Sequence, residues 1–484
     1  MHDALTRIEK LEKALAQRDA DIAQRDADIA RLTGEVKRLS ELLDLLKEKL
    51  GENSSNSSKP PSSDGGSAIR NARKRARKGR KTGRKRGGQK GHQGHRRALL
   101  PESEVDQFVN RYPEQCENCW ESLPKVPDPY AKRHQVTELP PIKPHTTEYR
   151  RHKVQCPCCG HRSRAPENTV PKSAFGPRLT SILALLTGVY HLSRRQAQQA
   201  AADLLGVTIS LGALSNLEAR VTGAIRPGVD EVWAQVRNAP VKHTDGTGWW
   251  QSGMAMQLWT IATVAATVFK IVVDGSKATL KPLFGTLKGV LNSDRAKALN
   301  FWAMKQRQIC WAHLLRKFVS FSERDGPAGS YGRRLLEYTS IIFAYWQSTK
   351  DGKLSRQAFS HRMGPLRRQF EALLQEAASA GLARLSGSCA DILAHRAALW
   401  TFVDRCDVEP TNNHGERELR AFVLWRKRSF GTQSARGNEF AESIMTFRNT
   451  ARKQRKNVLA LLTQCCEASE AGTAPPSLFA SQTI

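Results

Sequence analysis

The sequence has 484 residues, more than one hydrophobic core usually organises, so it predicts several domains. The formal net charge of +30 predicts attraction to a polyanion, and nucleic acid is the first candidate. No apolar run is long enough to span a bilayer and no signal peptide opens the chain, which argues against a membrane protein and predicts a cytoplasmic one.

Residues 1–50 carry an apolar repeat. Apolar side chains recur every seven positions between Ile8 and Leu50, and a second series of the same spacing accompanies the first. The segment AQRDADI occurs at 16–22 and again, unchanged, at 23–29. The pattern predicts a coiled coil and therefore a homo-oligomer. The alternative is a single amphipathic helix packed on the body of the protein.

Residues 51–98 are expected to be a disordered linker followed by a basic arm. The linker, residues 51–67, is mostly serine, glycine and proline and has almost nothing apolar to bury. The arm, residues 70–97, places cationic side chains among glycines, a composition suited to following a phosphate backbone. The alternative for the arm is a solvated tail that only improves solubility. The arm residues predicted to contact DNA are Arg73, Lys74, Arg75, Arg77, Lys78, Arg80, Lys81, Arg84, Lys85 and Arg86.

Residues 99–172 are predicted to form a zinc-ribbon-like module in a reducing compartment. Two Cys-x2-Cys pairs can bring thiolates to one tetrahedral Zn²⁺ from two turns, and a site closed by four protein ligands is structural. The alternative is two unrelated pairs of buried cysteines, because the separation between the pairs is long. Cys158, His152 and His161 could compete for the ion, so the exact ligands stay open. The predicted ligands are Cys116, Cys119, Cys156 and Cys159.

Residues 173–236 are predicted to be helical. Within them, residues 192–221 form two helical patterns separated by a Leu-Gly-Val turn at 205–207. This arrangement favours a helix-turn-helix, whose second helix can enter the major groove of DNA. The alternative is a plain helical hairpin that supports the following domain.

Strand patterns begin after Pro240. A short strand, residues 241–244, ends at Asp245, and a β-branched hairpin and a helix-like stretch follow. Another strand, residues 289–293, ends at Asp294. Carboxylates at the ends of neighbouring strands can share two Mg²⁺ ions, with Mn²⁺ as a substitute, and such a pair of ions promotes phosphodiester displacement. The alternative is that each aspartate only caps a turn or a helix.

The third carboxylate is expected to be Glu416, on a helix that begins near Asn412 or Asn413. Glu409 and Glu418 are its rivals. His243 and His414 flank this expected site in the sequence and are expected to support it or to be solvated. Basic residues follow Glu416 on the same helix and could hold the DNA backbone. They are Arg420, Arg426, Lys427 and Arg428.

Several motifs, taken in order along the chain, resemble one known family. They are NSSNSSKPPSSD, GGQKGHQGH, the paired cysteines, DGTGW, SDRAKA, CWAHLLRKF, NNHGERELR and RKRSF. Together they resemble transposases of the insertion-sequence sixty-six family, which are bacterial DDE transposases with an RNase H-like core. The resemblance implies that Asp245, Asp294 and Glu416 form the acidic triad. Gly246 departs from the family, whose members often carry an acidic residue directly after the first aspartate.

The resemblance also implies the remaining organisation. Residues 237–466 would be an α/β RNase H-like catalytic domain with a mostly helical insertion at about 321–408, followed by a tail at 467–484. Cys310 and His313 match a Cys-x2-His motif that stabilises the insertion; as metal ligands they would need further partners. The expected fold class is therefore multidomain: a coiled coil, a zinc-ribbon-like module, a helix-turn-helix region and this core.

The function implied is that of a DNA transposase which binds the ends of its insertion element, cleaves them and transfers strands. Its expected partners are double-stranded DNA at the element ends and the target, other copies of itself and accessory proteins of the same element, and it is expected to be associated with the nucleoid. One alternative is a DNA-binding regulator or bridging protein with an inactive core. A metal-dependent nuclease without strand transfer would share the same site.

Overall fold

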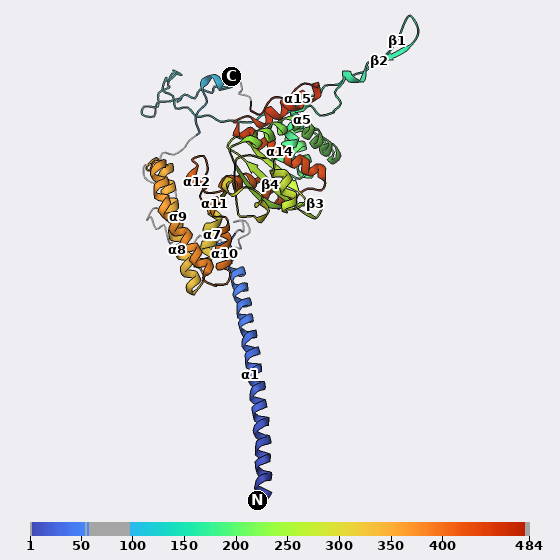
Figure 1. Ribbon diagram of the computed structural model, residues 1–484. Coiled ribbons are helices and arrows are strands. Elements are labelled where there is room, and N and C mark those ends of the chain that lie inside the picture. Colours follow the sequence, from blue (N-terminus) through green and yellow to red (C-terminus); the bar gives the residue numbers. More distant parts are fainter. Residues whose placement is uncertain (1, 54–55, 58–96, 480–484) are drawn as a thin grey trace. The chain divides into compact units, whose positions relative to one another are not determined.

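A computed structural model describes residues 2–53, 56–57 and 97–479 (Figure 1). The chain divides into two compact units, one of residues 1–70, 171–197 and 211–484, and the other of residues 71–170 and 198–210. The predicted DNA-contacting residues of the basic arm lie outside the described residues. In the described part of the chain, no helix combines the length and the apolarity needed to cross a membrane.

Helix α1, His2–Gly51, is one uninterrupted helix. Side chains of the seven-residue repeat such as Leu15, Ile29 and Val36 are exposed along it. The helix that the repeat predicts is therefore present, while its pairing into a coiled coil stays a prediction.

The second unit is mostly loop. Among its described residues, the regular elements are two single-turn helices, η2 at Glu102–Glu104 and η3 at Glu167–Thr169, two short strands and most of helix α4, Arg194–Leu205. Strand β1, Lys153–Gln155, pairs antiparallel with β2, Arg162–Arg164. All residues of both strands are exposed, so this hairpin contributes little to a hydrophobic core.

Three helices precede the sheet of the first unit: α3, Pro177–Gly188, α4, Arg194–Leu205, and α5, Leu211–Asn238. Helix α5 is long and packs its buried face on the C-terminal helices α14, Ala435–Lys453, and α15, Val458–Ala471. The predicted helix pair around 205–207 is thus present, and its second helix supports the core. Entry of this pair into a DNA groove stays a prediction.

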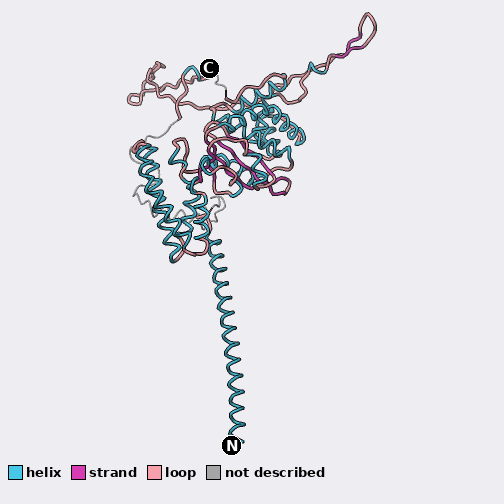
Figure 2. The backbone as a smooth tube through the Cα atoms, viewed as in Figure 1, coloured by secondary structure: helices cyan, strands magenta, loops and turns pink. Residues whose placement is uncertain are grey.

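The sheet has five strands in the order β5-β4-β3-β6-β7, shown as arrows in Figure 1 and in magenta in Figure 2. Neighbours in β5-β4-β3 run antiparallel, whereas β6 is parallel to both β3 and β7, so the sheet is mixed. The bounds are β3 Val241–Gln251, β4 Met254–Ala262, β5 Thr267–Val272, β6 Val290–Ser293 and β7 Arg307–Ile309. The predicted β-branched hairpin is confirmed as β4 and β5.

One boundary prediction was wrong: the first strand does not end at Asp245 but continues to Gln251. Its pairing with β4 covers His243 to Gln251, because the antiparallel hairpin provides backbone partners beyond the point where β6 ends. The second prediction is confirmed, since Asp294 directly follows β6. Helix α6, Lys277–Phe284, connects β5 to β6, and two short turns, Lys297–Leu299 and Met304–Gln306, connect β6 to β7.

Helix α14 covers the open edge of the sheet at β5. Three of its side chains, spaced four residues apart, accept hydrogen bonds from alternate backbone N–H groups of that strand. The pairs are Glu442 with Ile271, Thr446 with Phe269 and Thr450 with Thr267, at 2.7, 3.1 and 3.2 Å. These bonds give partners to backbone N–H groups of the edge strand β5 that would otherwise be unpaired.

A helical segment lies between β7 and the helix that carries Glu416, where the mostly helical insertion was expected. An aromatic core containing Trp311, Phe370 and Trp400 holds this segment together. Its helices are α7 Trp311–Ser322, α8 Gly326–Lys350, α9 Arg356–Ser379, α10 Ser386–Ala394, α11 Arg396–Leu399 and α12 Thr401–Asp404.

Helix α13, Asn413–Ser429, packs on β3 and β4. Trp249 of β3 meets Phe422 and Trp425 of α13 edge to face. Beyond α15 the chain is held by Leu478, which is fully buried and whose backbone N–H donates to Glu231 of α5. The described part of the expected tail is therefore anchored on the first unit.

Candidate active site

The register of β3 and β6 places two aspartates side by side. The last paired residues of the two parallel strands are His243 and Asn292, and Asp245 and Asp294 each lie two residues further along. Because side chains alternate along a strand, each aspartate is on the same face as the paired residue before it. Glu416 lies in the first turn of α13, the helix that packs on β3.

The electrostatic effect of Asp294 and Glu416 on Asp245 shows that the three groups lie close together. The pKa of Asp245 is raised to about 7, first by burial and then by the negative charges of Asp294 and Glu416, while Arg316 opposes these effects. A carboxyl group with such a pKa is destabilised as an anion unless a cation or a proton joins it. The structure thus brings together the three carboxylates that the sequence analysis selected.

Asn412, directly before α13, ties three elements together. Its side chain donates from Nδ2 to the Thr244 carbonyl at 2.7 Å, and its Oδ1 lies 3.2 Å from His243 Nδ1. Its backbone N–H donates to Cys310 Sγ at 3.1 Å. Burial lowers the pKa of His243 to about 4, so its ring is neutral and Nδ1 carries the proton that Oδ1 accepts. The sequence analysis noted this asparagine only as a helix start.

Cys310 and His313 lie against the acidic cluster. Their ligand atoms and one carboxylate oxygen of Glu416 all lie within 4.8 Å of one another. Burial raises the pKa of the Cys310 thiol to about 11, and His313 Nδ1 lies 3.7 Å from Glu416 Oε1. Cys310 Sγ also accepts the backbone N–H of Asn412, directly before α13. The geometry therefore fits a pair that joins the start of α7 to the start of α13.

Two arginines support the cluster. Arg316 Nη2 lies 3.5 Å from Glu416 Oε2. The buried Arg307 donates to Ser293 Oγ at 3.1 Å and to the Asp294 carbonyl at 2.8 Å, so it holds the loop that carries the second aspartate. Asp294 also accepts the Ala296 N–H at 2.9 Å, which is the turn-capping contact considered as the alternative. Sequence reasoning did not select either arginine.

The rival glutamates have partners of their own. Glu418 accepts a hydrogen bond from Asn449 at 2.7 Å and pairs with Lys453 at 3.3 Å. Glu409 pairs with Lys350 at 3.2 Å. His414 Nε2 lies 3.0 Å from the Thr263 carbonyl, which places this ring against the β4–β5 turn. Of the candidates, Glu416 is the one that raises the pKa of Asp245.

The basic residues of α13 differ in their surroundings. Arg420, Lys427 and Arg428 are exposed. Arg426 instead donates to Thr247 Oγ1 at 3.0 Å and to the Gly248 carbonyl of β3. Its guanidinium thus fastens α13 to the sheet, and DNA contact by all four residues stays a prediction.

Gly246 follows Asp245 at the position where the resemblance to the transposase family led us to expect an acidic residue. A Cβ atom at this position would lie 3.0 Å from the ring of Trp259 on the neighbouring strand, closer than ordinary packing allows. Trp259 in turn packs edge to face on Phe284 of α6. The tryptophan therefore occupies the space that a side chain at 246 would need.

The two cysteine pairs of the second unit adopt the same turn. In each, the first cysteine N–H donates to the residue five positions later and its carbonyl accepts from the residue four positions later. The residues in that fourth position, Trp120 and Gly160, both have positive φ. Backbone N–H groups lower the pKa of Cys116, first that of Asn118, and the pKa of Cys156, first that of Cys159. The first thiol of each pair therefore favours the thiolate that binds metal.

Because the two turns match, the first turn indicates which cysteines of the second turn are the equivalent zinc ligands. Cys156 and Cys159 correspond to Cys116 and Cys119, and Cys158 corresponds to Asn118. The two turns do not meet, however. Within the described residues, the one group of three or more His, Cys, Asp or Glu side chains with ligand atoms within 4.8 Å is that around Cys310.

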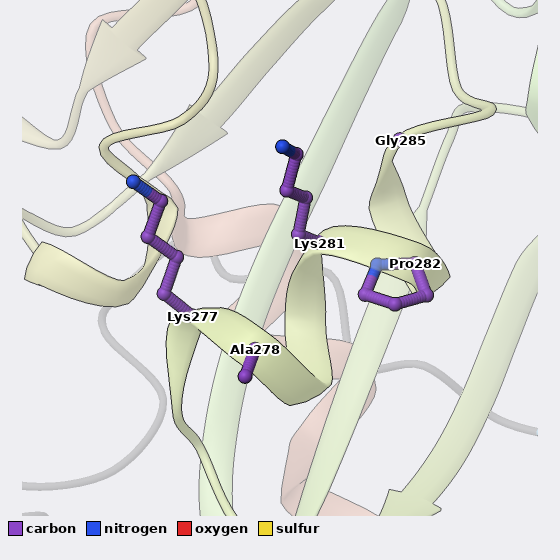
Figure 3. A pocket seen from close by; sticks show the side chains of 5 residues that line it. All are labelled: Lys277, Ala278, Lys281, Pro282 and Gly285. Atoms are coloured by element: carbon purple, nitrogen blue, oxygen red, sulfur yellow. The ribbon is translucent and has the colours of Figure 1, made fainter.

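A hollow of about 670 Å³ lies along α6 (Figure 3). Lys277 and Lys281 rise from this helix, and Ala278, Pro282 and Gly285 complete the lining. None of the three carboxylates lines it. The acidic cluster is therefore not part of this hollow, and its three carboxylates are half-buried.

Comparison with known families indicates an enzyme that modifies nucleic acid. The profile of the Transposase IS66 family matches residues 172–440, more than half of the chain, and includes all three carboxylates. The chain belongs to this family of transposases. A family of unknown function (DUF6444) matches residues 4–98. No match was found among curated proteins.

Proposed function

We propose that this transposase cleaves DNA at the ends of its insertion element and joins the freed ends to target DNA, with Asp245, Asp294 and Glu416 holding two Mg²⁺ ions. One observation carries the proposal: burial and two nearby negative charges raise the pKa of Asp245 to about 7. Three oxygen-donor side chains whose charges repel one another fit hard divalent cations. The mixed sheet flanked by helices supports an RNase H-like core.

The residues of the chain have separable tasks. Bound cations would polarise the scissile phosphate and favour the deprotonated form of the attacking water or 3′-hydroxyl. Asp245 must be a carboxylate to take part, so its proton leaves as the cations bind. Asn412 and Arg307 hold the backbone on which the carboxylates are mounted. The exposed Arg420 and Lys427 would contact DNA phosphates.

Two bond changes make up the proposed reaction. Water first attacks a phosphate at the element end, which breaks the P–O bond and leaves a 3′-hydroxyl. This hydroxyl then attacks a phosphate of the target strand, and the bond to the target 3′-oxygen breaks. The number of phosphodiester bonds is unchanged in the second step, so it needs no external energy source.

Labelled element ends test the proposal. Purified protein with Mg²⁺ should produce nicked and joined DNA, and the variants Asp294→Ala and Glu416→Gln should produce neither while still binding the ends. Glu409→Gln serves as the control, because this glutamate pairs with Lys350 away from the cluster. Cleavage retained by Glu416→Gln would refute the triad.

Two other functions make different predictions in the same assay. A regulator with an inactive core would bind the ends and yield no product in any variant. A nuclease without strand transfer would yield nicks and no joined DNA. The convergence of three carboxylates favours an active core over the regulator.

We also propose that a structural Zn²⁺ joins the two cysteine turns. The matching turns and the lowered pKa of Cys116 and Cys156 support it. The protein should contain about one zinc per chain, and a chelator should loosen residues 116–159, as seen by proteolysis. Cys156→Ser should lose the metal. Cys158→Ser, the matched control, should keep it, and equal zinc content in both variants would contradict this ligand set.

A further inference from the structure

Two exposed aromatic residues stand on neighbouring backbone segments where the hairpin of β3 and β4 ends. The segment after α13 pairs with this end: Thr432 N–H donates to the Trp250 carbonyl at 2.9 Å, and Ser252 N–H donates to the Thr432 carbonyl at 2.8 Å. Gly431 lies so close that a Cβ atom there would be 2.1 Å from the Trp250 carbonyl oxygen. Phe430 precedes this glycine. We call Trp250 and Phe430 the aromatic tip.

The backbone conformation of Phe430 is strained. Its φ is 56° and its ψ is 26°, the left-handed region that bulky side chains rarely adopt. Its side chain is 77% exposed, and that of Trp250 is 44% exposed. Burial of the ring therefore does not offset the backbone strain, and a glycine would suit this helix end better. Neither burial nor backbone preference therefore accounts for a phenylalanine at this position.

The surroundings of the aromatic tip suit a polyanion. Arg428 lies in the last turn of α13, two residues before Phe430, and is exposed. The same helix carries Glu416 in its first turn, and the strand that carries Asp245 leads to Trp250. Two elements thus connect the tip to the acidic cluster. A single DNA molecule bound at the carboxylates can follow α13 to the tip.

We propose that the aromatic tip stacks on an unpaired base of the DNA that the acidic cluster cleaves, a step that rests on the proposed function. In an intact duplex the faces of the bases are covered by their neighbours, so an aromatic ring gains most from a base that has left the stack. The cations of α13 hold the adjoining phosphates, and the tip binds the base. Recognition of this kind tolerates any base, because every base has a flat face.

Binding measurements on the full-length chain test this role. The protein carries Glu416→Gln to prevent cleavage, and the probes are the element's terminal sequence as a paired duplex, as a duplex with one unpaired base, and as a single strand. The unpaired-base duplex should bind most tightly. Phe430→Gly and Trp250→Ala should each weaken that binding about tenfold and leave the paired duplex nearly unaffected. Ile341→Ala, which alters an exposed apolar residue of α8, should change neither.

A second measurement separates this role from a structural one. Phe430→Gly should raise the melting temperature, because glycine adopts positive φ without strain, even as it weakens binding to the unpaired base. Phe430→Tyr should keep the affinity. Equal affinity of parent and Phe430→Gly for all probes would overturn the proposal, and so would full affinity in Phe430→Leu, which would indicate an apolar wedge. Loss of self-association in Phe430→Gly with unchanged DNA binding would overturn it in favour of a contact between copies.

The two proposals fail differently. If the parent chain without the Glu416 substitution yields no cleavage with Mg²⁺ while the tip variants still lose affinity for the unpaired base, the proposed function is wrong and the tip remains a base-binding surface. If the parent chain cleaves and the tip variants bind every probe as the parent does, the aromatic tip alone is wrong.

Discussion

Asn412 connects the strand of the first aspartate, the helix of the glutamate and the helical segment between them. Asn412→Ala should destabilise the protein by about 1–3 kcal/mol, because it leaves the buried Thr244 carbonyl and the His243 ring without partners. It should also reduce cleavage. Urea unfolding and the cleavage assay measure both effects. The exposed neighbour Asn413 provides the control, and an equal loss from Asn413→Ala would count against this assignment.

The raised pKa of Asp245 predicts a pH dependence of metal binding. A carboxyl group with a pKa of about 7 holds its proton below that pH, and Mg²⁺ must displace the proton. The apparent affinity for Mg²⁺ should therefore fall about tenfold for each pH unit below about 7 and level off above it. Calorimetric titration across this range measures the slope. Asp245→Asn cannot ionise, so any residual Mg²⁺ binding in it should lose this slope.

Without metal, the raised pKa of Asp245 makes the stability of the folded protein depend on pH. The pKa of Asp245 in the folded protein lies above its value of 3.8 in the unfolded chain, so the folded state binds this proton more tightly. The stabilisation that the folded protein gains from this proton is complete below pH 3.8 and is lost as the pH rises through about 7. Mg²⁺ should consequently stabilise the protein most above pH 7.

At the scale of single residues, the sequence identified the carboxylates but not the residues that hold them in position. Asp294 follows a short strand pattern and Glu416 lies in a recognisable motif, so local patterns and resemblance identify both. Arg307 and Asn412 act through partners that only the fold brings near. Their side-chain types carry no local signal for that task.

The contact between α14 and β5 depends on the register of the helix against the strand. Thr446→Val keeps the shape of the side chain but removes the acceptor for the Phe269 N–H, and should cost about 1–3 kcal/mol of unfolding free energy. Chemical denaturation measures this loss. Thr463→Val is the matched control, since its hydroxyl bonds only to the Leu459 carbonyl of its own helix. Equal stability of Thr446→Val and the parent would contradict the edge contact.

The order and type of the elements were largely predictable, because β-branched runs and helical periods are local properties. The extent of β3 was not, since pairing with β4 carries the strand past Asp245. The length of α5 beneath α14 was likewise hidden, because it depends on the packing of distant segments. Register between elements is a property of the tertiary structure.

For the whole molecule, α1 predicts how copies associate. Ile22 and Ile29 belong to the seven-residue repeat and are exposed in the single chain. If they pair with another copy, Ile22→Asp with Ile29→Asp should convert the oligomer to monomers, because each buries an unpaired charge. Analytical ultracentrifugation measures the mass. Ala30→Asp adds a charge at an exposed position beside the repeat and should leave the oligomer intact.

The central claim is that the three carboxylates hold a pair of divalent cations on DNA. Anomalous scattering from Mn²⁺ in crystals of the full chain with its element-end DNA tests it most directly. The account predicts two manganese peaks between Asp245, Asp294 and Glu416, beside the scissile phosphate. Absence of both peaks in a DNA complex, with Glu416 still against Arg316, would contradict it.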